Sequence, residues 1–570
     1  ASSHPGSSAG VAKLRTHGPG KNVRVELNDI GRQLNRDIAP ALIDLVEIAA
    51  LVYVGDQMAR RGADDVETMG ANWRRRLRFE IPVRVPELWR SHEVTDALIA
   101  LLSFLSEDEY EFTFSQYKSP PSLDAYLRFG KVADQAPPES VVLFSGGLDS
   151  LGGVVEEVIR DGKASLLVTH AAAGTMRDRH HTLTSMIANA TRGPRPQFVT
   201  VRASKKHRAE KEYTQRARSF LYASFAVAVA RVADLDAIRF YENGVVSLNL
   251  PLSPQVVGSR ATRTTHPRVL ACMRKLFSLV TGSPFGVENR FMWKTKADVV
   301  ADIVRAGHGA MIDYSISCTH TRKYRRDQPH CGSCSQCIDR RFAVLAAGAG
   351  QFEPEDRYRH KLLTDPRGEG ESRIMLASYL ETAQRVAAMD ITAFYNRYGE
   401  AVRALPHIDL PVDDAAKRIY DLSRRHGEQI VGAITEAGRA HMGQIVNRSL
   451  PESCTLRLVH DPNPNTAPVS APAAVGAVEP PPATHQLVQE GQAWLLRFDG
   501  IDKRFALSVG MLYIRELLAS PGRPFTVAQL YAMARPHLKD IPSARAEAKF
   551  DAKEARAIWV RLNELNDEIA

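Results

Sequence analysis

A glycine- and serine-rich stretch, VVLFSGGLDS at residues 141–150, begins with four apolar residues. The pattern predicts a buried strand that ends at Phe144 and a helix that begins within SLGGVVEEVIRDG. The first N–H groups of a helix have no partner inside the helix and carry partial positive charge. Glycines let this backbone approach an anion closely, and serines add hydroxyl donors. The residues predicted to bind phosphate are Ser145, Gly146, Gly147, Leu148 and Ser150.

Asp149 adds a carboxylate to this predicted phosphate turn. A carboxylate repels bound phosphate unless a divalent cation bridges the two, so Asp149 indicates Mg²⁺ together with a nucleotide such as ATP. The turn is not a Walker A loop, because no Gly-Lys-Ser or Gly-Lys-Thr follows it. The simpler alternative is an ordinary turn with a serine cap, which leaves the number of polar donors unexplained.

Four of the six cysteines follow the spacing C-x12-C-x2-C-x2-C within SCTHTRKYRRDQPHCGSCSQCIDRR. Four thiolates at this spacing suit tetrahedral Zn²⁺, and a closed four-thiolate site stabilises a fold rather than supplying chemistry. We expect neither His320 nor His330 to be a ligand. The predicted zinc ligands are Cys318, Cys331, Cys334 and Cys337.

The elements that must position these residues alternate between short apolar runs and helical stretches over residues 138–350. The runs are SVVLFSG, ASLLVTH, PQFVTVR and AIRFYENG, and RARSFLYASFAVAVARVA is one of the helical stretches. Such alternation is typical of a parallel sheet with helices on its faces, so the predicted fold class is α/β.

Changes in composition indicate how the rest of the chain is divided into parts. The first residues are rich in Gly, Ser and Pro, and a later segment is rich in Pro and Ala and nearly uncharged, which is typical of an extended linker. The last segment resembles a hairpin followed by a winged-helix-like unit. The predicted parts are a disordered lead (1–21), an N-terminal α+β module (22–130), the α/β core (138–350), a helical extension (351–460), the linker (461–486) and a winged-helix-like module (487–570).

The chain has 570 residues, of which 44% are hydrophobic and 24% charged, as in soluble globular proteins. Its formal charge of +9 suits a polyanionic ligand, such as a nucleotide or a nucleic acid, without requiring one. No apolar run approaches the ~20 residues that a membrane span needs, and the first residues lack the apolar region of a secretory signal. With few cysteines and no export signal, a cytoplasmic protein is expected.

The residues S-G-G-L-D-S resemble the PP-loop of the N-type ATP pyrophosphatases, which split ATP between the α and β phosphates and adenylate a substrate. The same turn followed by the cysteines and arginines of CGSCSQCIDRR resembles the 7-cyano-7-deazaguanine synthase (QueC-like) family. Those enzymes adenylate 7-carboxy-7-deazaguanine and use ammonia to make an amide and then a nitrile. The longer layout is similar to QueC-like proteins of bacterial anti-phage systems, where a protein amine is an alternative acceptor. The resemblance covers about 138–350.

The resemblance also implies roles for residues outside the turn. QRARSFLYASFAVAVA is similar to a family helix that flanks the nucleotide, and MWKTKADVVADIV to a segment in which Lys294 or Lys296 meets phosphates. The implied catalytic residues are Asp149, Ser145 and Lys296, with Mg²⁺ on Asp149. The residues implied near ATP, besides the turn, are Arg216, Arg218 and Ser219.

Substrate recognition is expected in YENGVVSLNLPLSPQVVGSRATRTTHPR, a polar stretch that emerges from a predicted strand. Glu242 and Asn243 are candidates to read the edge of a deazapurine base, and TRTTHP to bind its carboxylate. No general base is evident besides His266, and the alternative reading is a solvated loop. The candidate substrate residues are Glu242, Asn243, Arg260, Arg263, Thr264, Thr265 and His266.

Two other functions stay open. A PP-loop enzyme of tRNA thiolation would need reactive cysteines in the nucleotide cleft, where only Cys272 is expected nearby. A non-catalytic nucleotide sensor or scaffold would use the winged-helix-like module for DNA or protein, and the lack of a dense basic helix favours protein. The expected partners are ATP, a deazapurine carboxylate and a protein, with no membrane; nucleic-acid binding and a homodimer are left open.

Overall fold

The computed structural model describes residues 12–18, 20–30, 38–59, 74–120, 127–129, 136–170, 177–205, 215–250, 263–319, 327–368, 371–460, 486–490, 493–498 and 501–506. The chain divides into two units, Ala1–Thr466 and Ala467–Ala570, and the division falls inside the predicted linker. None of the described helices is long and apolar enough to cross a membrane.

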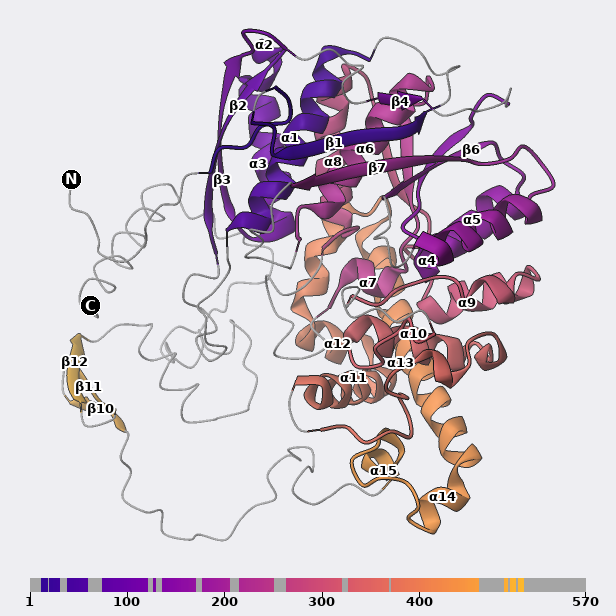
Figure 1. The fold of residues 1–570 in the computed structure, drawn as a ribbon. Helices are drawn as coiled ribbons and strands as arrows, with labels where there is room; N and C mark the ends of the chain where they lie inside the picture. The colour runs from indigo at the N-terminus through magenta and orange to yellow at the C-terminus, as the bar shows by residue number, and fades with distance from the viewer. Residues whose placement is uncertain are drawn as a thin grey trace. The chain divides into compact units, whose positions relative to one another are not determined.

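A seven-stranded sheet lies at the centre of the first unit (Figure 1). Its order is β4-β1-β7-β6-β5-β8-β9, and every neighbouring pair is parallel except β1 with β7. The α/β class with a mostly parallel sheet is therefore confirmed. The strands are β1 (Val23–Ile30), β4 (Leu127–Phe129), β5 (Ser140–Leu143), β6 (Ser165–His170), β7 (Gln197–Lys205), β8 (Ala237–Phe240) and β9 (Gly286–Asn289).

Helices cover both faces of this sheet, because strands such as β5 are apolar at successive positions and point side chains to both sides. Val142 packs against one set: α4 (Leu148–Val154) with its π-helical continuation (Val155–Arg160), α5 (Arg177–Ala190), α9 (Lys296–Arg305) and α10 (Ser335–Ala346). Val141 and Leu143 face the other set: α1 (Pro40–Met58), α3 (His92–Ser106), α6 (Arg218–Val232) and α8 (Pro267–Thr281).

The first strand of the predicted N-terminal module lies in the central sheet, where Val23 to Asn28 pair with β7. Helix α1 is apolar on nearly all sides, and such a helix has to be buried; it packs against β1, β7 and α6. The rest of the module is a two-stranded parallel sheet of β2 (Arg76–Val83) and β3 (Glu109–Gln116), joined by α2 (Pro86–Trp89) and α3. The predicted lead contacts β1 at Arg15, whose carbonyl accepts a hydrogen bond from the N–H of Val23 (2.9 Å).

Helices follow the sheet, as the predicted extension requires. Helix α13 packs against α10, α11 and α15. The helices are α11 (Glu371–Ala388), α12 (Ile391–Arg397), the 3-10 helix η11 (Gly399–His407), α13 (Val412–Ala440), α14 (Met442–Val446) and α15 (Thr455–His460). In the second unit, β10 (Gln486–Glu490), β11 (Ala493–Phe498) and β12 (Ile501–Ala506) form an antiparallel sheet that contains the predicted hairpin. Residues 461–485 of the predicted linker (461–486) and residues 507–570 of the predicted winged-helix-like module (487–570) lie outside the described residues.

A buried ion cluster joins the N-terminal region to α6. The guanidinium of Arg75 lies 2.5 Å from Asp56 and 2.6 Å from Asp108, and both carboxylates are fully buried. Asp56 also accepts from the backbone N–H of Ala217, just ahead of α6 (3.2 Å). Burying three charges is tolerated only while each has its partners.

Replacing Arg75 by leucine leaves two carboxylates buried without their cation, so Arg75→Leu should lower the free energy of unfolding by about 3–5 kcal/mol. The neighbouring pair of Arg76 with Glu109 is exposed, and Arg76→Leu should cost little. Urea unfolding of the full chain measures both. Equal midpoints for the two variants would contradict the structural role given to the buried cluster.

Candidate active site and metal centre

The predicted phosphate turn is closed by its own serines. The hydroxyl of Ser150 donates to the Gly147 carbonyl (3.0 Å), and the Ser145 hydroxyl lies 3.1 Å from that of Ser150. Ser145 Oγ also accepts from the Gly147 N–H (3.2 Å). Leu148 is buried and begins α4. The turn is therefore held in one shape by bonds within it, at the carboxyl end of β5.

Three glycines allow close approach at this turn. Gly146 has φ +75, and a Cβ there would lie 3.4 Å from the ring of His180 on α5. On α4 itself, a Cβ at Gly152 would lie 2.4 Å from Val299, and one at Gly153 only 2.1 Å from Tyr241. Gly146 thus allows the backbone conformation of the turn, and Gly152 and Gly153 allow α4 to pack closely.

Asp149 lies beside a lysine and an asparagine from other elements. Its carboxylate accepts from Asn243 Nδ2 (3.2 Å) and lies 3.4 Å from Lys296 Nζ. Lys296 Nζ is also 2.7 Å from Asp339, a residue of α10 that the sequence reasoning did not single out. Asp149, Asn243 and Lys296 were predicted from three separate stretches of sequence, and the fold brings them together.

Lys296 is almost completely buried, with 2% of its side chain exposed. Burial by itself lowers the pKa of a lysine, but the carboxylates of Asp149 and Asp339 outweigh it and raise the pKa of Lys296 above its ordinary value. Burial would raise the pKa of Asp339, and the ammonium of Lys296 instead holds it below its ordinary value. The site therefore keeps a fixed positive charge next to Asp149.

Glu242 lies next to this group, at the carboxyl end of β8. Burial, with the charge of Asp149 as a smaller cause, raises the pKa of Glu242 to about 7, although a hydrogen bond from Thr265 opposes the shift. The Thr265 hydroxyl lies 2.9 Å from that of Ser247, and Asn289 donates to the Glu242 carbonyl (2.8 Å). Glu242 can therefore gain or lose a proton near neutral pH.

The other candidate substrate residues lie apart from Asp149. Arg263 is 2.5 Å from Glu107 and donates to the Phe104 carbonyl (3.1 Å), on the side of α3. His266 caps the N-terminus of α8, accepting from the Arg268 N–H (3.1 Å). Thr264 is half-buried between these two residues. Arg260 lies outside the described residues.

The residues implied near ATP lie at the start of α6 and just before it. Arg218 donates to the Tyr222 hydroxyl one helical turn further on (3.1 Å). Arg216 and Ser219 are buried at the start of α6, which packs on the face of the sheet opposite α4. Their contribution to nucleotide binding stays a prediction.

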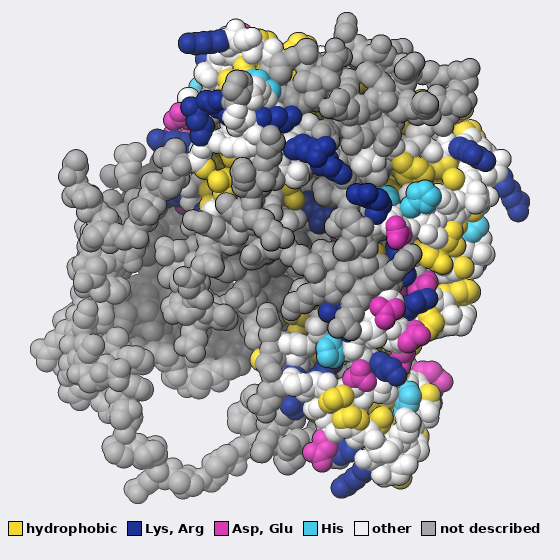
Figure 2. Space-filling model, viewed as in Figure 1, with side chains coloured by type: hydrophobic (Ala, Val, Ile, Leu, Met, Phe, Trp, Pro, Cys, Tyr) yellow, Lys and Arg dark blue, Asp and Glu magenta, His cyan; other side chains and the backbone are white. Residues whose placement is uncertain are grey.

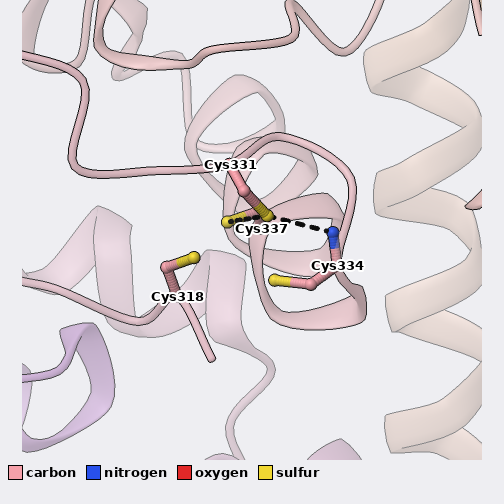
Figure 3. Close-up of side chains that lie close together, drawn as sticks. All are labelled: Cys318, Cys331, Cys334 and Cys337. Carbon is pink, nitrogen blue, oxygen red and sulfur yellow. Dashed lines mark hydrogen bonds between the residues drawn. The ribbon is translucent and has the colours of Figure 1, made fainter. Parts of the chain in front are cut away.

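The four predicted zinc ligands form one buried cluster (Figure 3). Three come from the turn leading into α10 and its first turn, and Cys318 reaches them from a separate segment. All four sulfurs lie within 4.8 Å of one another, and those of Cys331 and Cys337 are 3.8 Å apart. Ligands at ~2.3 Å from a tetrahedral Zn²⁺ are about 3.8 Å apart, so the cluster can hold zinc.

Backbone and thiol contacts prepare this cluster for a metal. The N–H groups of Ser333 and Cys334 donate to Cys331 Sγ, at 3.4 and 3.3 Å. Two backbone N–H donors favour a thiolate on Cys331, which is the form that zinc requires. His330 is not among the clustered ligands, as expected, and His320 lies outside the described residues.

One short segment connects the cysteine cluster with the Ser145–Ser150 turn. The Ile316 N–H donates to the Gly146 carbonyl (2.9 Å), two residues before Cys318. Arg340 of α10 is fully buried, pairs with Glu353 (2.6 Å), and donates to the hydroxyl of Ser317 (3.2 Å). Arg340 of the cysteine motif therefore supports the segment that bonds to Gly146, a role that the sequence did not reveal.

The helical extension completes the site. Gln429 of α13 accepts from the Thr295 hydroxyl (2.7 Å) and donates to Asp298 (2.8 Å), the two residues that cap the first turn of α9 around Lys296. Tyr379 of α11 donates to Asp339 (2.8 Å). Sequence reasoning missed these contacts, since nothing in a helical period indicates which distant turn a glutamine or tyrosine will meet.

A comparison of the chain with protein-family models finds no match, and a comparison with curated proteins finds none either. Any inference about function therefore depends on the geometry of the turn, the charged group around Lys296 and the cysteine cluster.

The close packing of α4 is testable at Gly153. Gly153→Ala should lower the free energy of unfolding by about 1–3 kcal/mol, because its methyl group has no room beside Tyr241. Gly432 of α13 has nothing within reach of a Cβ, and Gly432→Ala should raise stability by up to about 1 kcal/mol. Urea unfolding measures the stability of both variants. If Gly153→Ala stabilised the protein as Gly432→Ala does, the close packing of α4 against Tyr241 would be contradicted.

The metal centre is testable at Cys334. Cys334→Ser should release zinc and lower the free energy of unfolding by about 4 kcal/mol or more, the range of a lost structural metal. Cys272 lies on α8 outside the cluster, and Cys272→Ser should retain one zinc per chain. Metal analysis gives the zinc content of each variant, and thermal unfolding gives its stability. Native protein that carries no stoichiometric metal would refute the assignment.

Proposed function

We propose that this chain is a QueC-like PP-loop enzyme that uses ATP to adenylate 7-carboxy-7-deazaguanine and then transfers the acyl group to an amine. The acceptor is ammonia or an amine of a partner protein within an anti-phage system. With ammonia the product is an amide, whose oxygen a second ATP adenylates with loss of pyrophosphate; AMP then leaves with that oxygen, two protons are lost from the nitrogen, and a nitrile remains. The observation that carries the proposal is the contact of Asp149 with Lys296 beside a serine- and glycine-rich turn at the carboxyl ends of parallel strands.

The residues of this turn suit a triphosphate with Mg²⁺. The hydroxyls of Ser145 and Ser150 and the carboxylate of Asp149 are oxygen ligands, which Mg²⁺ prefers, and Asp149 would hold the ion. When bound, Mg²⁺ neutralises charge on the phosphates. Lys296 adds a permanent cation at the same place, because its pKa is raised. A lysine with a lowered pKa would not serve this purpose.

The chemistry takes two steps. A carboxylate oxygen of the substrate attacks the α-phosphorus of ATP, the bond to the bridging oxygen of the β-phosphate breaks, and pyrophosphate leaves with the electron pair. The amine nitrogen then attacks the acyl carbon of the adenylate, and AMP leaves with the electron pair of the broken carbon–oxygen bond. The nitrogen loses one proton. Charge that develops on the pyrophosphate is stabilised by Lys296.

Glu242 is the residue best suited to take the proton from the amine. Its pKa of about 7 gives a carboxylate that is partly ionised at neutral pH and can accept a proton. His266 was the earlier candidate from the sequence, but burial and the charge of Arg263 lower its pKa to about 3, and it caps α8. A base with such a low pKa holds a proton poorly.

Two alternatives have less support. Thiolation would need a cysteine near Asp149, and Cys272 packs on the opposite face of the sheet from α4. A nucleotide-sensing scaffold would not need a lysine such as Lys296 paired with Asp149. The Asp149→Asn variant described next distinguishes a scaffold from an enzyme.

The proposal predicts AMP and pyrophosphate when the full chain is incubated with ATP, Mg²⁺, 7-carboxy-7-deazaguanine and ammonia. Asp149→Asn should reduce AMP formation roughly 100-fold or more, because the phosphates lose their metal ligand and Lys296 its partner. Asp161→Asn is the control, since Asp161 pairs with Arg160 away from the turn.

Native protein that releases no AMP with this substrate, with ammonia or with a candidate partner protein, would exclude the substrate. Equal AMP formation by Asp149→Asn and Asp161→Asn would exclude Asp149 from the reaction. Intact mass of a co-expressed partner shows whether a protein amine takes the acyl group. If the chain is a nucleotide-sensing scaffold, it should bind ATP and release no AMP.

A further inference from the structure

Three arginines and a histidine surround one phenylalanine outside the Asp149 group. Phe104 lies near the end of α3 and is buried. The guanidinium carbons of Arg268, Arg263 and Arg403 lie 4.5, 4.8 and 5.6 Å from the centre of its ring. The imidazole of His266 lies 5.1 Å from the same ring. One aromatic ring of α3 is therefore surrounded by arginines from the segment before α8, from α8 and from η11.

Positive charge exceeds negative charge in this cluster. Arg263 is paired with Glu107 at 2.5 Å. Among the residues that the structure describes, neither Arg268 nor Arg403 has a carboxylate within ion-pair distance. The sequence explains the imbalance, because residues 243–287 contain five Lys or Arg and no Asp or Glu. Two guanidiniums next to one ring are thus left without a counter-charge.

The start of α8 adds to this imbalance. The N-terminus of a helix is its positive end and is usually stabilised by acidic residues, but the first turn of α8 has none and carries Arg268. His266 is 5% exposed, and burial together with Arg263 and its other cationic neighbours keeps it neutral, lowering its pKa to about 3.

His266 also presents a donor to this place. Its Nδ1 accepts from the Arg268 N–H, so the proton of the neutral ring is on Nε2. That N–H has no acceptor among the described residues. This nitrogen is not among the buried side-chain atoms that lack a partner, so the donor is accessible to a ligand at the surface of the cluster.

We propose that Arg268, Arg403 and the Nε2–H of His266 bind a doubly charged phosphate group. Two uncompensated guanidiniums match the charge of a phosphate monoester, which is close to −2 at neutral pH, better than they match a single carboxylate. The site is separate from the Ser145–Ser150 turn and does not depend on the proposed reaction. It adjoins that reaction's site through Thr265, the neighbour of His266, whose hydroxyl donates to Glu242.

Calorimetric titration of the full chain with inorganic phosphate tests the site. Arg403 is exposed and its replacement should not disturb folding, and Arg403→Gln should weaken phosphate binding roughly ten- to hundred-fold. Arg268→Gln should do the same. Arg397→Gln, at the exposed end of α12, is the charge-matched control, and Ser150→Ala is the control for the phosphate turn. Arg397→Gln should bind phosphate as the native chain does, and Ser150→Ala should keep the part of the binding that Arg403→Gln removes.

The source of the phosphate is distinguished by two further titrations. An oligonucleotide with a 5′-phosphate should displace inorganic phosphate if a terminal monoester is the natural ligand, and the same oligonucleotide without it should not. Displacement by AMP alone would indicate a free nucleotide as the source. The proposal is overturned if the native chain does not bind phosphate, if Arg403→Gln binds it as tightly as Arg397→Gln, or if Ser150→Ala abolishes the binding.

Discussion

The buried ammonium of Lys296 is the interaction on which the rest of this site depends. Taking a charge out of water costs several kcal/mol, and the structure offsets that cost with two carboxylates, those of Asp149 and Asp339. These residues come from the first turns of α9 and α4 and from α10. The three helices must therefore keep fixed positions relative to the phosphate turn, or a buried charge loses its partner.

Much of the surrounding structure holds those helices in place. The cysteine cluster fixes the start of α10, and Arg340 on the same helix binds the segment that supports Gly146. Gln429 of the helical extension holds the capped end of α9. The cysteine cluster and the extension are consequently parts of one support, although each is distant in sequence from the turn. Arginine and lysine side chains are also frequent over the upper part of the visible face, where acidic side chains are few (Figure 2).

The sequence predicted those features whose cause is local. The apolar runs that became β5, β6, β7 and β8 were recognisable because a strand buried on both faces needs apolar side chains at successive positions. The buried cysteine cluster followed from spacing alone, since two of its three intervals lie within one helical turn. Asp149 and Lys296 were predicted from motifs, and their contact follows from strand ends meeting at one edge of the sheet.

Features that depend on distant contacts were not predictable in this way. Asp339 and Arg340 stand side by side in the motif, yet one pairs with Lys296 and the other with Glu353 only because α10 presents them in different directions. The first strand joined the central sheet through its pairing with β7, and Arg263 and His266 lie against Phe104 rather than beside Asp149. Such outcomes depend on tertiary packing, which a local sequence pattern does not encode.

Exchange of labelled pyrophosphate into ATP tests the central claim most directly, because it reports reversible cleavage between the α and β phosphates without any acceptor amine. With Mg²⁺ and 7-carboxy-7-deazaguanine, the account predicts that label enters ATP, and that omitting the deazaguanine carboxylate stops the exchange. Absence of exchange under these conditions, or release of ADP and phosphate in its place, would contradict it.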